Sequence, residues 1–384
     1  MIIDSDQHLY ESRTLWLEHI DPKMRAEALR IEDDAAGMSW LRWRDRSLGL
    51  AEVQVPGRTT ELGEQHRRAQ EGHGPAVPYD EALPRHYWDP VARLAKLSDL
   101  GLDEAVVFPN YGLLWERTLH DALPALHANM HAWNRWCADV VRDGRGRLHP
   151  VAHLSLRDPD WLEAQLVALD AAGVRLAMIA PALVDGRPLS HPAHDRLWSA
   201  FVEHGITPVF HVADQPRPFA DAWYTDEKEA FVPVLTAVFI HTAAALASAD
   251  LILNGTLERF PDLRIGIVEL SSMWVPLFLM MLDGGAAFTR QLNGREPAKL
   301  SLAPSDYFRR QVRVSSFSYE NPAVLAQQVG GDILMCCSDY PHTEGTATPI
   351  GDYANMGSSA ATAPGLFSDN VAFLLRKPAP ADRS

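Results

Sequence analysis

The chain has 384 residues, 47% of them hydrophobic, and a formal net charge of -15 at pH 7. This length and apolar content suit one large α/β barrel with loop insertions, so two separate domains are not required. The negative charge argues against nucleic acid or an anionic membrane as a partner, because both are bound through clustered Lys and Arg; a small anionic substrate stays open, since a bound metal can dominate the field at a site.

Eight short apolar runs rich in β-branched residues are predicted strands. In chain order they cover residues 2–6, 105–109, 148–154, 174–180, 207–212, 264–269, 311–315 and 333–338. Near-continuous apolar strands of this kind are typical of a parallel sheet buried on both faces. Helical patterns lie between them, and several end at a glycine. The alternation predicts a (β/α)8 TIM barrel, which we expect to be a single domain over residues 1–384.

Two segments interrupt the alternation. Residues 36–88, rich in Gly, Pro, Arg and Trp, form a long insertion after the first strand, and residues 214–232 form a second after the fifth. Both follow carboxyl ends of strands, where barrel enzymes build their active sites, so we expect a lid or pocket wall rather than plain surface. The last residues, about 376–384, are predicted to be a frayed tail.

Aromatic and basic residues in and near these insertions are candidate pocket residues. An aromatic pocket could include Trp40, Trp43, Trp88, Trp115 and Trp223, although Trp is equally at home in a core under long loops. A substrate carboxylate could be held by Arg58 or Arg217, although surface Arg is the commoner case.

The segment 230–249 contains no Asp, Glu, Lys or Arg, and its length approaches that of a membrane span. Pro233, His241 and many alanines make it only weakly hydrophobic. We therefore expect a buried helix and no association with a membrane.

The three cysteines suit reduced thiols better than a disulfide framework, because their number is odd and two of them are adjacent: Cys137, Cys336 and Cys337. The N-terminus lacks a basic region followed by an apolar stretch, so nothing resembles a signal peptide. We expect a cytoplasmic protein.

Ionisable residues cluster at the ends of the first, fifth and eighth predicted strands. Asp6 and His8 stand two positions apart and would share one face of the first strand. His211 ends the fifth strand, and Asp339 follows the eighth. Taken singly, each is an ordinary hydrogen-bonded, capping or turn residue. Two imidazoles and two carboxylates converging at one end of a barrel form a candidate site for one Zn²⁺ or Mn²⁺, since both accept mixed nitrogen and oxygen ligands.

Motifs along most of the chain resemble the amidohydrolase superfamily, specifically the amidohydrolase-related branch that includes aminocarboxymuconate semialdehyde decarboxylase. They are IIDSDQHLYE, YWDPVARLAKLSDLGLDEAVVFPN, RLHPVAHLSLRDPD, HPAHDRLWSAFVEHGITPVFHV, NGTLERFPDLRIGIVELSSMW and CSDYPHTEG. The resemblance implies a (β/α)8 barrel and a homodimer. It also implies one divalent metal held by a motif in the first strand, a His in the fifth and an Asp in the eighth: here Asp6 and His8, His211, and Asp339.

The sequence departs from this branch at two strands. The first strand has Asp6-Gln7-His8 where many members have His or Glu two positions before His. The sixth ends in Glu269, where many decarboxylases of the branch carry a catalytic His. Glu269 could act as the acid or base if burial raises its pKa. His241 is a second candidate, although a lone His on an apolar helix is usually structural. His342 could contact a metal-binding residue or the substrate, or could be a turn residue.

The resemblance leaves three functions open. Non-oxidative decarboxylation of a small carboxylated or ring-containing molecule leads, because the nearest pattern is that of the decarboxylases. A metal-bound hydroxide could instead hydrolyse an amide, lactone or C–C bond, with Asp339 moving the proton. The third is a catalytically silent barrel that binds a ligand; retention of all four candidate ligands argues against it.

Overall fold

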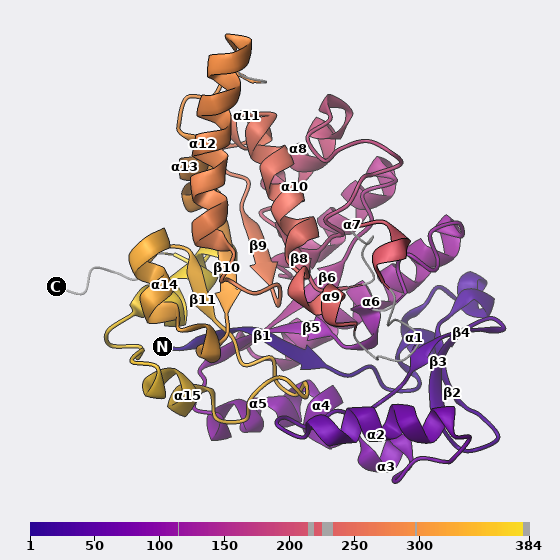
Figure 1. Cartoon of the computed structure of the whole chain (residues 1–384). Coiled ribbons are helices and arrows are strands. Elements are labelled where there is room, and N and C mark those ends of the chain that lie inside the picture. Colours follow the sequence, from indigo (N-terminus) through magenta and orange to yellow (C-terminus); the bar gives the residue numbers. More distant parts are fainter. Residues whose placement is uncertain (114, 214–218, 225–232, 296–297, 379–384) are drawn as a thin grey trace.

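Eight parallel strands form a nearly closed barrel surrounded by helices (Figure 1). The computed structural model describes residues 1–113, 115–213, 219–224, 233–295 and 298–378. Each strand pairs with the next barrel strand along the chain, in the order β1-β5-β6-β7-β8-β9-β10-β11. All eight predicted strands are present within a few residues of their expected positions, and the predicted (β/α)8 architecture is confirmed.

The strands and helices have the following bounds. The barrel strands are β1 (Ile3–Leu9), β5 (Glu104–Pro109), β6 (Leu148–His153), β7 (Leu176–Met178), β8 (Thr207–His211), β9 (Ile265–Val268), β10 (Val312–Ser316) and β11 (Leu334–Cys336). The longer helices are α2 (Thr59–Gln70), α5 (Pro90–Asp99), α6 (Leu123–Asp143), α7 (Pro159–Ala171), α8 (Asp195–Glu203), α10 (Thr242–Leu253), α12 (Val275–Asn293), α13 (Pro304–Gln311) and α14 (Pro322–Val329). The short ones are α1 (Leu15–His19), α3 (Tyr79–Ala82), α4 (Arg85–Trp88), α9 (Val234–Val238), α11 (Thr256–Arg259), α15 (Pro349–Asn355) and α16 (Asn370–Leu374).

The first and last strands close the barrel at their carboxyl ends. Gln7 bridges to Tyr340 in parallel, the amide of His8 donates to the carbonyl of Tyr340 at 2.8 Å, and the amide of Asp339 donates to the carbonyl of Asp6 at 2.9 Å. The buried carboxylate of Asp4 accepts from the amide and the hydroxyl of Ser338. These contacts hold the two strand ends that carry the candidate ligands side by side.

Two apolar clusters lie on opposite faces of the strands. Val106 and Phe108 of β5 belong to a small cluster inside the barrel, whereas their neighbours Ala105 and Val107 belong to the large cluster between strands and helices. This period of two is the one expected for a sheet buried on both faces. Residues of α16 join the inner cluster, and the hydroxyl of Thr207, the first residue of β8, donates to the carbonyl of Leu374, so α16 lies at the amino ends of the strands.

A small sheet that the sequence analysis did not predict begins just before the insertion at residues 36–88 and continues into it. Strands β2 (Arg30–Asp33), β3 (Ser39–Trp43) and β4 (Arg46–Leu50) pair antiparallel, before α2, α3 and α4. Residues 36–88 lack a sustained period, but β3 does alternate between buried and partly buried residues. When hydrophobic periodicity is read over a window longer than these five residues, the alternation of β3 is averaged with that of its neighbours and is lost.

The expectation of a buried helix at 230–249 is wrong for most of its described part. None of the α9 residues is buried, and α10 buries only the face that carries Ala244, Ala247 and Leu251. Val234–Leu253 is long and apolar enough to cross a membrane by length and composition alone, and 28% of its most apolar window is buried. The weak hydrophobicity of this segment indicated a core helix, yet most of its residues are not buried.

Candidate metal and proton-transfer site

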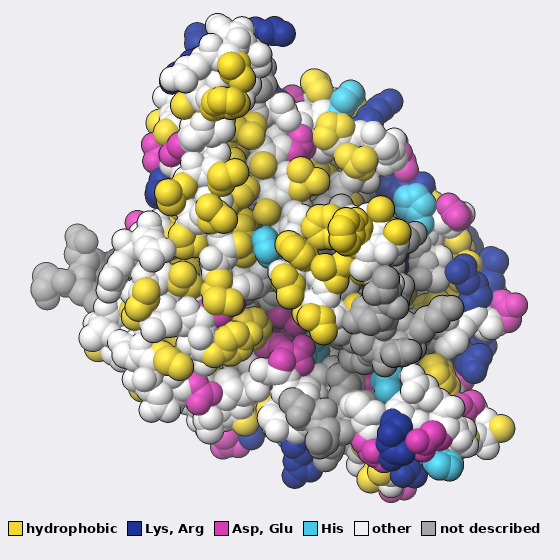
Figure 2. Space-filling view, in the orientation of Figure 1, with side chains coloured by type: hydrophobic (Ala, Val, Ile, Leu, Met, Phe, Trp, Pro, Cys, Tyr) yellow, Lys and Arg dark blue, Asp and Glu magenta, His cyan; other side chains and the backbone are white. Residues whose placement is uncertain are grey.

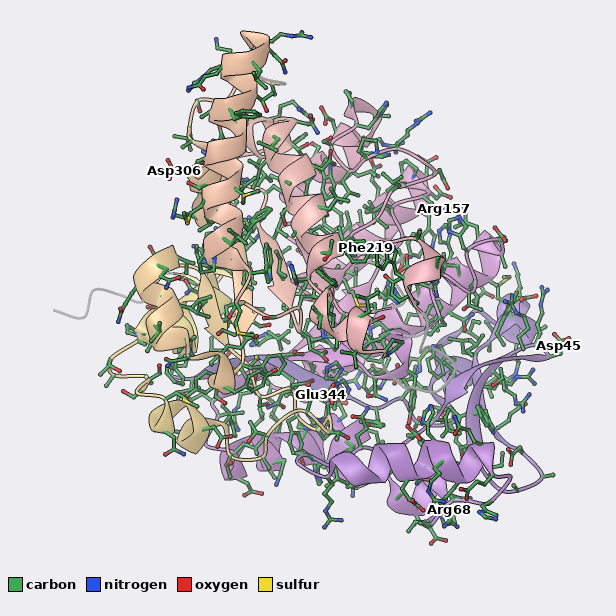
Figure 3. The ribbon with its side chains drawn as sticks, viewed as in Figure 1. Asp45, Arg68, Arg157, Phe219, Asp306 and Glu344 are labelled. Atoms are coloured by element: carbon green, nitrogen blue, oxygen red, sulfur yellow. The ribbon has the colours of Figure 1, made fainter. Side chains whose placement is uncertain are left out.

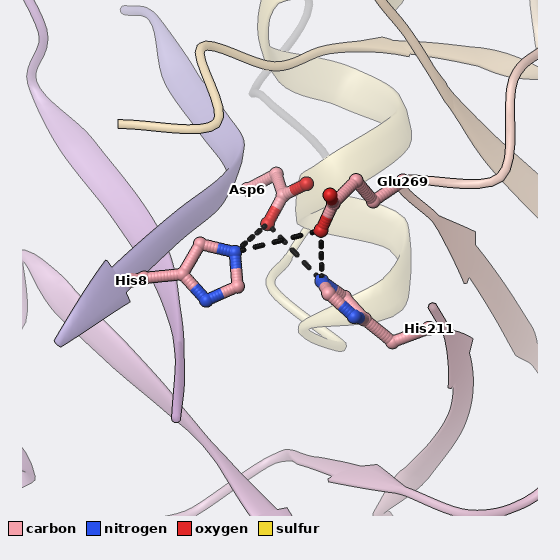
Figure 4. Close-up of side chains that lie close together, drawn as sticks. All are labelled: Asp6, His8, His211 and Glu269. Carbon is pink, nitrogen blue, oxygen red and sulfur yellow. Dashed lines mark ion pairs between the residues drawn. The ribbon is translucent and has the colours of Figure 1, made fainter. Parts of the chain in front are cut away.

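Six buried ionisable side chains meet at the carboxyl end of the barrel. They come from β1, from the end of β8 and from the segments after β9 and β11, and Figure 4 shows four of them. Their nitrogen and oxygen atoms form two overlapping groups, within each of which all ligand atoms lie within 4.8 Å of one another: Asp6, His8, His211 and Glu269, and His8, Glu269, Asp339 and His342.

Short distances link the members of both groups. Nε2 of His8 lies 3.4 Å from Oδ1 of Asp6, 3.6 Å from Oε2 of Glu269 and 3.3 Å from Oδ1 of Asp339. Nε2 of His211 lies 3.5 Å from Oδ1 of Asp6 and 3.2 Å from Oε2 of Glu269 (Figure 4). The four predicted metal ligands, Asp6, His8, His211 and Asp339, therefore come together, and Glu269, predicted as an acid or base, joins them.

A β-bulge turns Asp6 and His8 into the barrel. Along β1 the pairing with β5 advances three residues from Asp4 to Gln7, while β5 advances only two. Ile3 belongs to the cluster inside the barrel, so strict alternation would direct Asp6 and His8 to the opposite face. The extra residue reverses the alternation, and both side chains enter the site.

The residues after β9 and β11 have unusual backbone conformations. Val268 already belongs to the inner cluster, so alternation would send the next side chain, Glu269, outward. Glu269 instead has a left-handed φ of 54°, as does Asp339, a conformation that is uncommon for residues other than glycine. The hydroxyl of Ser315 accepts from the amide of Glu269 and holds this turn. Such conformations tend to persist at functional sites, where the surroundings enforce them.

Backbone carbonyls fix the tautomers of the two imidazoles. Nδ1 of His8 donates to the carbonyl of Pro109 at 3.0 Å, and Nδ1 of His211 donates to the carbonyl of Val212 at 2.7 Å. In a neutral imidazole the other nitrogen then carries the lone pair, so each Nε2 presents an acceptor to the group. Metal-binding histidines are commonly oriented in this way.

The buried atoms of the group lack hydrogen-bond partners, and a cation would supply what they lack. Among the described residues, Nε2 of His8 and of His211, both carboxylate oxygens of Asp6 and of Asp339, and Oε2 of Glu269 have none. Buried polar atoms are rarely left without a partner. Donor atoms bound at about 2.1 Å in a tetrahedral or octahedral site lie roughly 3.0–3.4 Å apart. The distances from Nε2 of His8 and of His211 to the carboxylate oxygens, 3.2–3.6 Å, lie within or just above this range, so a small contraction would fit one divalent ion.

The pKa values show how strongly these charges depend on one another. Burial raises the pKa of Glu269 and raises that of Asp339 further, and the two carboxylates repel. Burial lowers the pKa of His8, but the nearby carboxylates of Asp339 and Asp6 outweigh it and the net pKa is raised. Burial opposes ionisation of Asp6, yet His211 and His8 bring its pKa below the ordinary value. The group therefore either retains protons or binds a cation that displaces them.

His342 lies between Asp339 and Asn110. Its Nδ1 is 2.9 Å from Oδ1 of Asp339, and its Nε2 donates to Oδ1 of Asn110 at 2.8 Å. Its ring stacks on that of His8 with centroids 3.8 Å apart. Burial, followed by the charge of His8, lowers the pKa of His342 to about 4.

The other sequence candidates lie elsewhere. His241 precedes α10 and stacks on Trp274, and it belongs to neither group of candidate ligands. Trp115 is fully buried, whereas Trp223 is largely exposed. The five tryptophans take different environments: Trp43 belongs to the core, Trp40 is partly buried and Trp88 is exposed. Arg58 is exposed on the surface before α2, and Arg217 lies outside the described residues, as does most of the predicted tail.

Sequence reasoning missed three polar residues at this end of the barrel. Asn110 follows β5, two positions after the inward Phe108, and Gln54 accepts from the amide of Thr343 at 2.8 Å. His153 ends β6, two positions after the inward Val151, and its Nε2 lies 3.0 Å from a carboxylate oxygen of Glu116 while Nδ1 has no partner among the described residues. Position two residues beyond the last inward apolar residue was the available signal for Asn110 and His153.

Known proteins resemble this chain in family and in fold. Residues 88–376 match a family model described as amidohydrolase. A search of curated proteins finds no match. Among solved structures, an amidohydrolase from Mycobacterium avium subsp. paratuberculosis K-10 has a TM-score of 0.76 and 23% identity, covering 97% of this chain and 98% of that one.

Two solved decarboxylases share the fold at lower identity. One, from Novosphingobium aromaticivorans, is a 5-carboxyvanillate decarboxylase complexed with manganese and 4-hydroxy-3-methoxy-5-nitrobenzoic acid, with a TM-score of 0.66, 18% identity, and coverage of 98% of this chain and 96% of that one. The other, a 2,6-dihydroxybenzoate decarboxylase from Rhizobium, has a TM-score of 0.65, 16% identity, and coverage of 98% of both chains.

Proposed function

This chain belongs to the amidohydrolase family, and from that premise we propose that it removes the carboxyl group of a small ring-containing acid without oxidation. The observation that carries the proposal is the convergence of buried, unpartnered carboxylate and imidazole atoms on one point at the carboxyl end of the barrel. The likeness in fold to the two decarboxylases supports this reaction over hydrolysis.

We assign the metal to Asp6, His8 and His211, with Glu269 and Asp339 completing the set. Three of these side chains offer carboxylate oxygen and two offer imidazole nitrogen, a mixture that both Mn²⁺ and Zn²⁺ accept. Manganese is our first choice, because the 5-carboxyvanillate decarboxylase of similar fold was solved with manganese. A bound divalent cation supplies positive charge that orients a substrate carboxylate and stabilises charge that develops beside it.

The protein's own residues would supply the proton. Oδ1 of Asp339 lies beside His8 and His342 on the side of the candidate ligands. With that oxygen toward the metal, Oδ2 would carry the proton that passes to a ring carbon at the mouth of the barrel. That proton bonds to the carbon bearing the carboxylate, and when CO₂ departs, the electron pair of the broken C–C bond restores the ring. Nδ1 of His342, whose ring is held by Asn110, lies 2.9 Å from Oδ1 of Asp339 and would relay a proton to it after first accepting that proton itself.

We propose that residues 36–88 form a wall or lid over this site. The amide of Gly57 donates to the carbonyl of Thr343 at 3.0 Å, and His86 contacts the hydroxyl of Tyr340 at 2.9 Å. Both partners belong to the loop that carries Asp339 and His342. Glu344 of the same loop lies between the barrel and α2 (Figure 3). A segment bonded to this loop can exclude water from the site and select the substrate.

The proposal extends to assembly and compartment. We expect a single-domain enzyme that acts as a homodimer in the cytoplasm. The three cysteines support a reducing compartment, because all of them are free and buried.

The test is product analysis on manganese-loaded and zinc-loaded protein. The panel contains benzoic acids with a hydroxyl group beside a ¹³C-labelled carboxylate, in ¹⁸O-labelled water. Release of ¹³CO₂ with an unlabelled ring product supports decarboxylation. Entry of one ¹⁸O atom into a cleaved amide or lactone in a parallel panel would favour hydrolysis instead. His211→Ala should abolish turnover, whereas the exposed His73→Ala is the matched control. Tight metal binding without turnover on either panel would favour the silent barrel.

A further inference from the structure

A broad apolar surface covers α12, α10 and α9 on one face of the molecule (Figure 2). We call it the α10–α12 surface. Its large side chains are each at least 58% exposed: Val234, Val238, Leu246, Met273, Leu277, Met280, Met281, Phe288 and Leu292. Beside α9, Phe219 contacts Phe239 and extends the same surface (Figure 3). Single exposed apolar residues need no explanation, but a contiguous patch of this size marks an interaction site.

The exposed residues of α12 form one stripe along the helix. Leu277, Met281, Phe288 and Leu292 recur at the three- and four-residue steps of a helix face, and Gly284 with Gly285 stands at the middle of the stripe. A Cβ atom added at either glycine would meet nothing within 4 Å. The fold therefore does not require glycine there, and glycine in a helix interior is less stable than alanine. Two adjacent exposed glycines do allow another helix to approach closely.

The stripe is symmetric about this glycine pair. Leu277 stands seven positions before Gly284, and Leu292 stands seven positions after Gly285. Met281 stands three positions before the pair, and Phe288 three positions after it. A second copy of α12 that runs antiparallel and crosses at the glycines would therefore place Met281 against Phe288 of the partner subunit. A surface that matches itself under a two-fold rotation is what an isologous dimer requires.

A groove beside the stripe offers a place for apolar side chains of that second copy. It has a volume of about 300 Å³ and lies between α10 and α12. Its lining includes Ala249 and Leu253 of α10 and Phe278, Met281 and Gly285 of α12. The groove is centred on the same part of α12 as the glycine pair, so one docking geometry would fill it and pack the stripe.

Size and charge favour a second copy over a membrane. A helix of α12's length extends about 28 Å, and two packed helices span about 20 Å, so the two helices alone present on the order of 500 Å². With α9 added, this approaches the roughly 800 Å² that each partner buries in a stable interface. Charged residues such as Asp306 lie at the edge (Figure 3), and the net charge of -15 opposes an anionic bilayer.

We infer that the α10–α12 surface is the interface of a two-fold homodimer, in which α12 packs antiparallel on the same helix of the partner and crosses it at Gly284 and Gly285. The inference deepens the proposed assembly and rests on it, but it does not depend on the proposed reaction.

The first test is the mass in solution, by light scattering after size exclusion, of wild type and of Met281→Glu/Phe288→Glu. Wild type should show twice the 42.6 kDa of one chain, and the double variant should show one chain with an unchanged circular dichroism spectrum. Val167→Glu on α7, which replaces an apolar residue of similar exposure, should stay dimeric. A monomeric wild type, or a dimer that survives in the double variant, overturns the inference.

The second test reads the register by disulfide formation. Met281→Cys protein mixed with Phe288→Cys protein should give a cross-linked pair under mild oxidant, whereas Val167→Cys mixed with Phe288→Cys should not. The native cysteines are buried and should not react. Equal cross-linking in both mixtures overturns the register. Flotation of wild type with neutral phosphatidylcholine vesicles, lost in Met281→Glu/Phe288→Glu, would assign the surface to a membrane instead.

Discussion

Oε2 of Glu269 lies 3.2 Å from Nε2 of His211, within the same buried group of candidate ligands as Asp6. A residue whose only role is to protonate the substrate does not need to lie within ion-pair distance of a metal-binding imidazole. The geometry favours Glu269 as a ligand, while His241, the other residue considered in place of the missing histidine, stacks on Trp274 outside the group.

Glu269→Gln should therefore lower metal affinity by at least about 10-fold, because an amide replaces a charged ligand beside two imidazoles. His241→Asn should retain metal and most of the activity. Elemental mass spectrometry of both folded variants, purified without chelator, measures the difference. Full metal content in Glu269→Gln together with lost turnover would return Glu269 to an acid–base role.

His342 and Asn110 provide a test of the proton path. His342→Gln should keep the metal and lower turnover by about 10²–10⁴-fold, the usual contribution of a positioned proton donor. Asn110→Leu, which removes the acceptor that fixes the ring, should cause a smaller loss. The buried His194, which bonds to the carbonyl of Pro188, gives the control variant His194→Gln with normal turnover. Loss of metal from His342→Gln would identify this residue as a ligand.

Buried Arg93 should stabilise the barrel end that carries the site. Its guanidinium donates to the carbonyls of His86 and His8 and to the side chain of Gln7. Arg93→Met leaves these acceptors buried without a donor, so we expect a loss of about 3–5 kcal/mol in the free energy of unfolding. The exposed Arg85→Met, which breaks only a surface pair with Asp89, should change it by less than about 1 kcal/mol. Urea unfolding at saturating manganese compares the two, and equal losses would contradict a structural role for Arg93.

His86 should make stability depend on pH. Burial, with Arg93 and Lys96, lowers its pKa to about 4, whereas an unfolded chain has a His pKa near 6.5. Between these values the unfolded chain binds a proton that the folded chain does not, so the free energy of unfolding falls as pH falls from about 6.5 to 4. Because the ring is partly exposed, we expect an effect of only about 1 kcal/mol.

The measurement is urea unfolding of wild type and His86→Gln across pH 4–7. The variant should show the shallower dependence, while His73→Gln, on the exposed surface, should follow wild type. Parallel curves for wild type and His86→Gln would show that the imidazole of His86 titrates equally in both states.

The sequence predicted the barrel well and the insertions poorly, for one physical reason. Barrel strands are buried on both faces, so their apolar runs are visible without knowing the fold. Strands β2 to β4 are short and half-exposed, and their period is lost among Gly, Pro and Arg. The exposed face of α9 and α10 resembled a core helix because apolar composition does not reveal whether a second surface covers it.

The site was predictable to the extent that it obeys strand periodicity. His211 and Asp339 stand where the ends of their strands suggested. Glu269 was a candidate acid or base in the sequence, but strand alternation points its side chain outward. Its left-handed backbone turns it inward, so only the fold reveals that it lies among the candidate ligands. The hydrogen-bond partners of the His8 and His211 imidazoles are backbone carbonyls, which cannot be identified from the residue types in the sequence.

Because of the bulge between Asp4 and Gln7, the inward direction of Asp6 and His8 depends on the number of residues in this strand as well as on their identity. Deletion of Ser5 would leave every candidate ligand in the sequence and still rotate Asp6 and His8 away from His211, whereas many substitutions at Ser5 would not. Mutational selection in this stretch should therefore tolerate exchanges and purge single-codon insertions and deletions, a pattern opposite to that of a surface loop. Relatives that share the site should have the same number of residues in this strand, even where the amino acids differ.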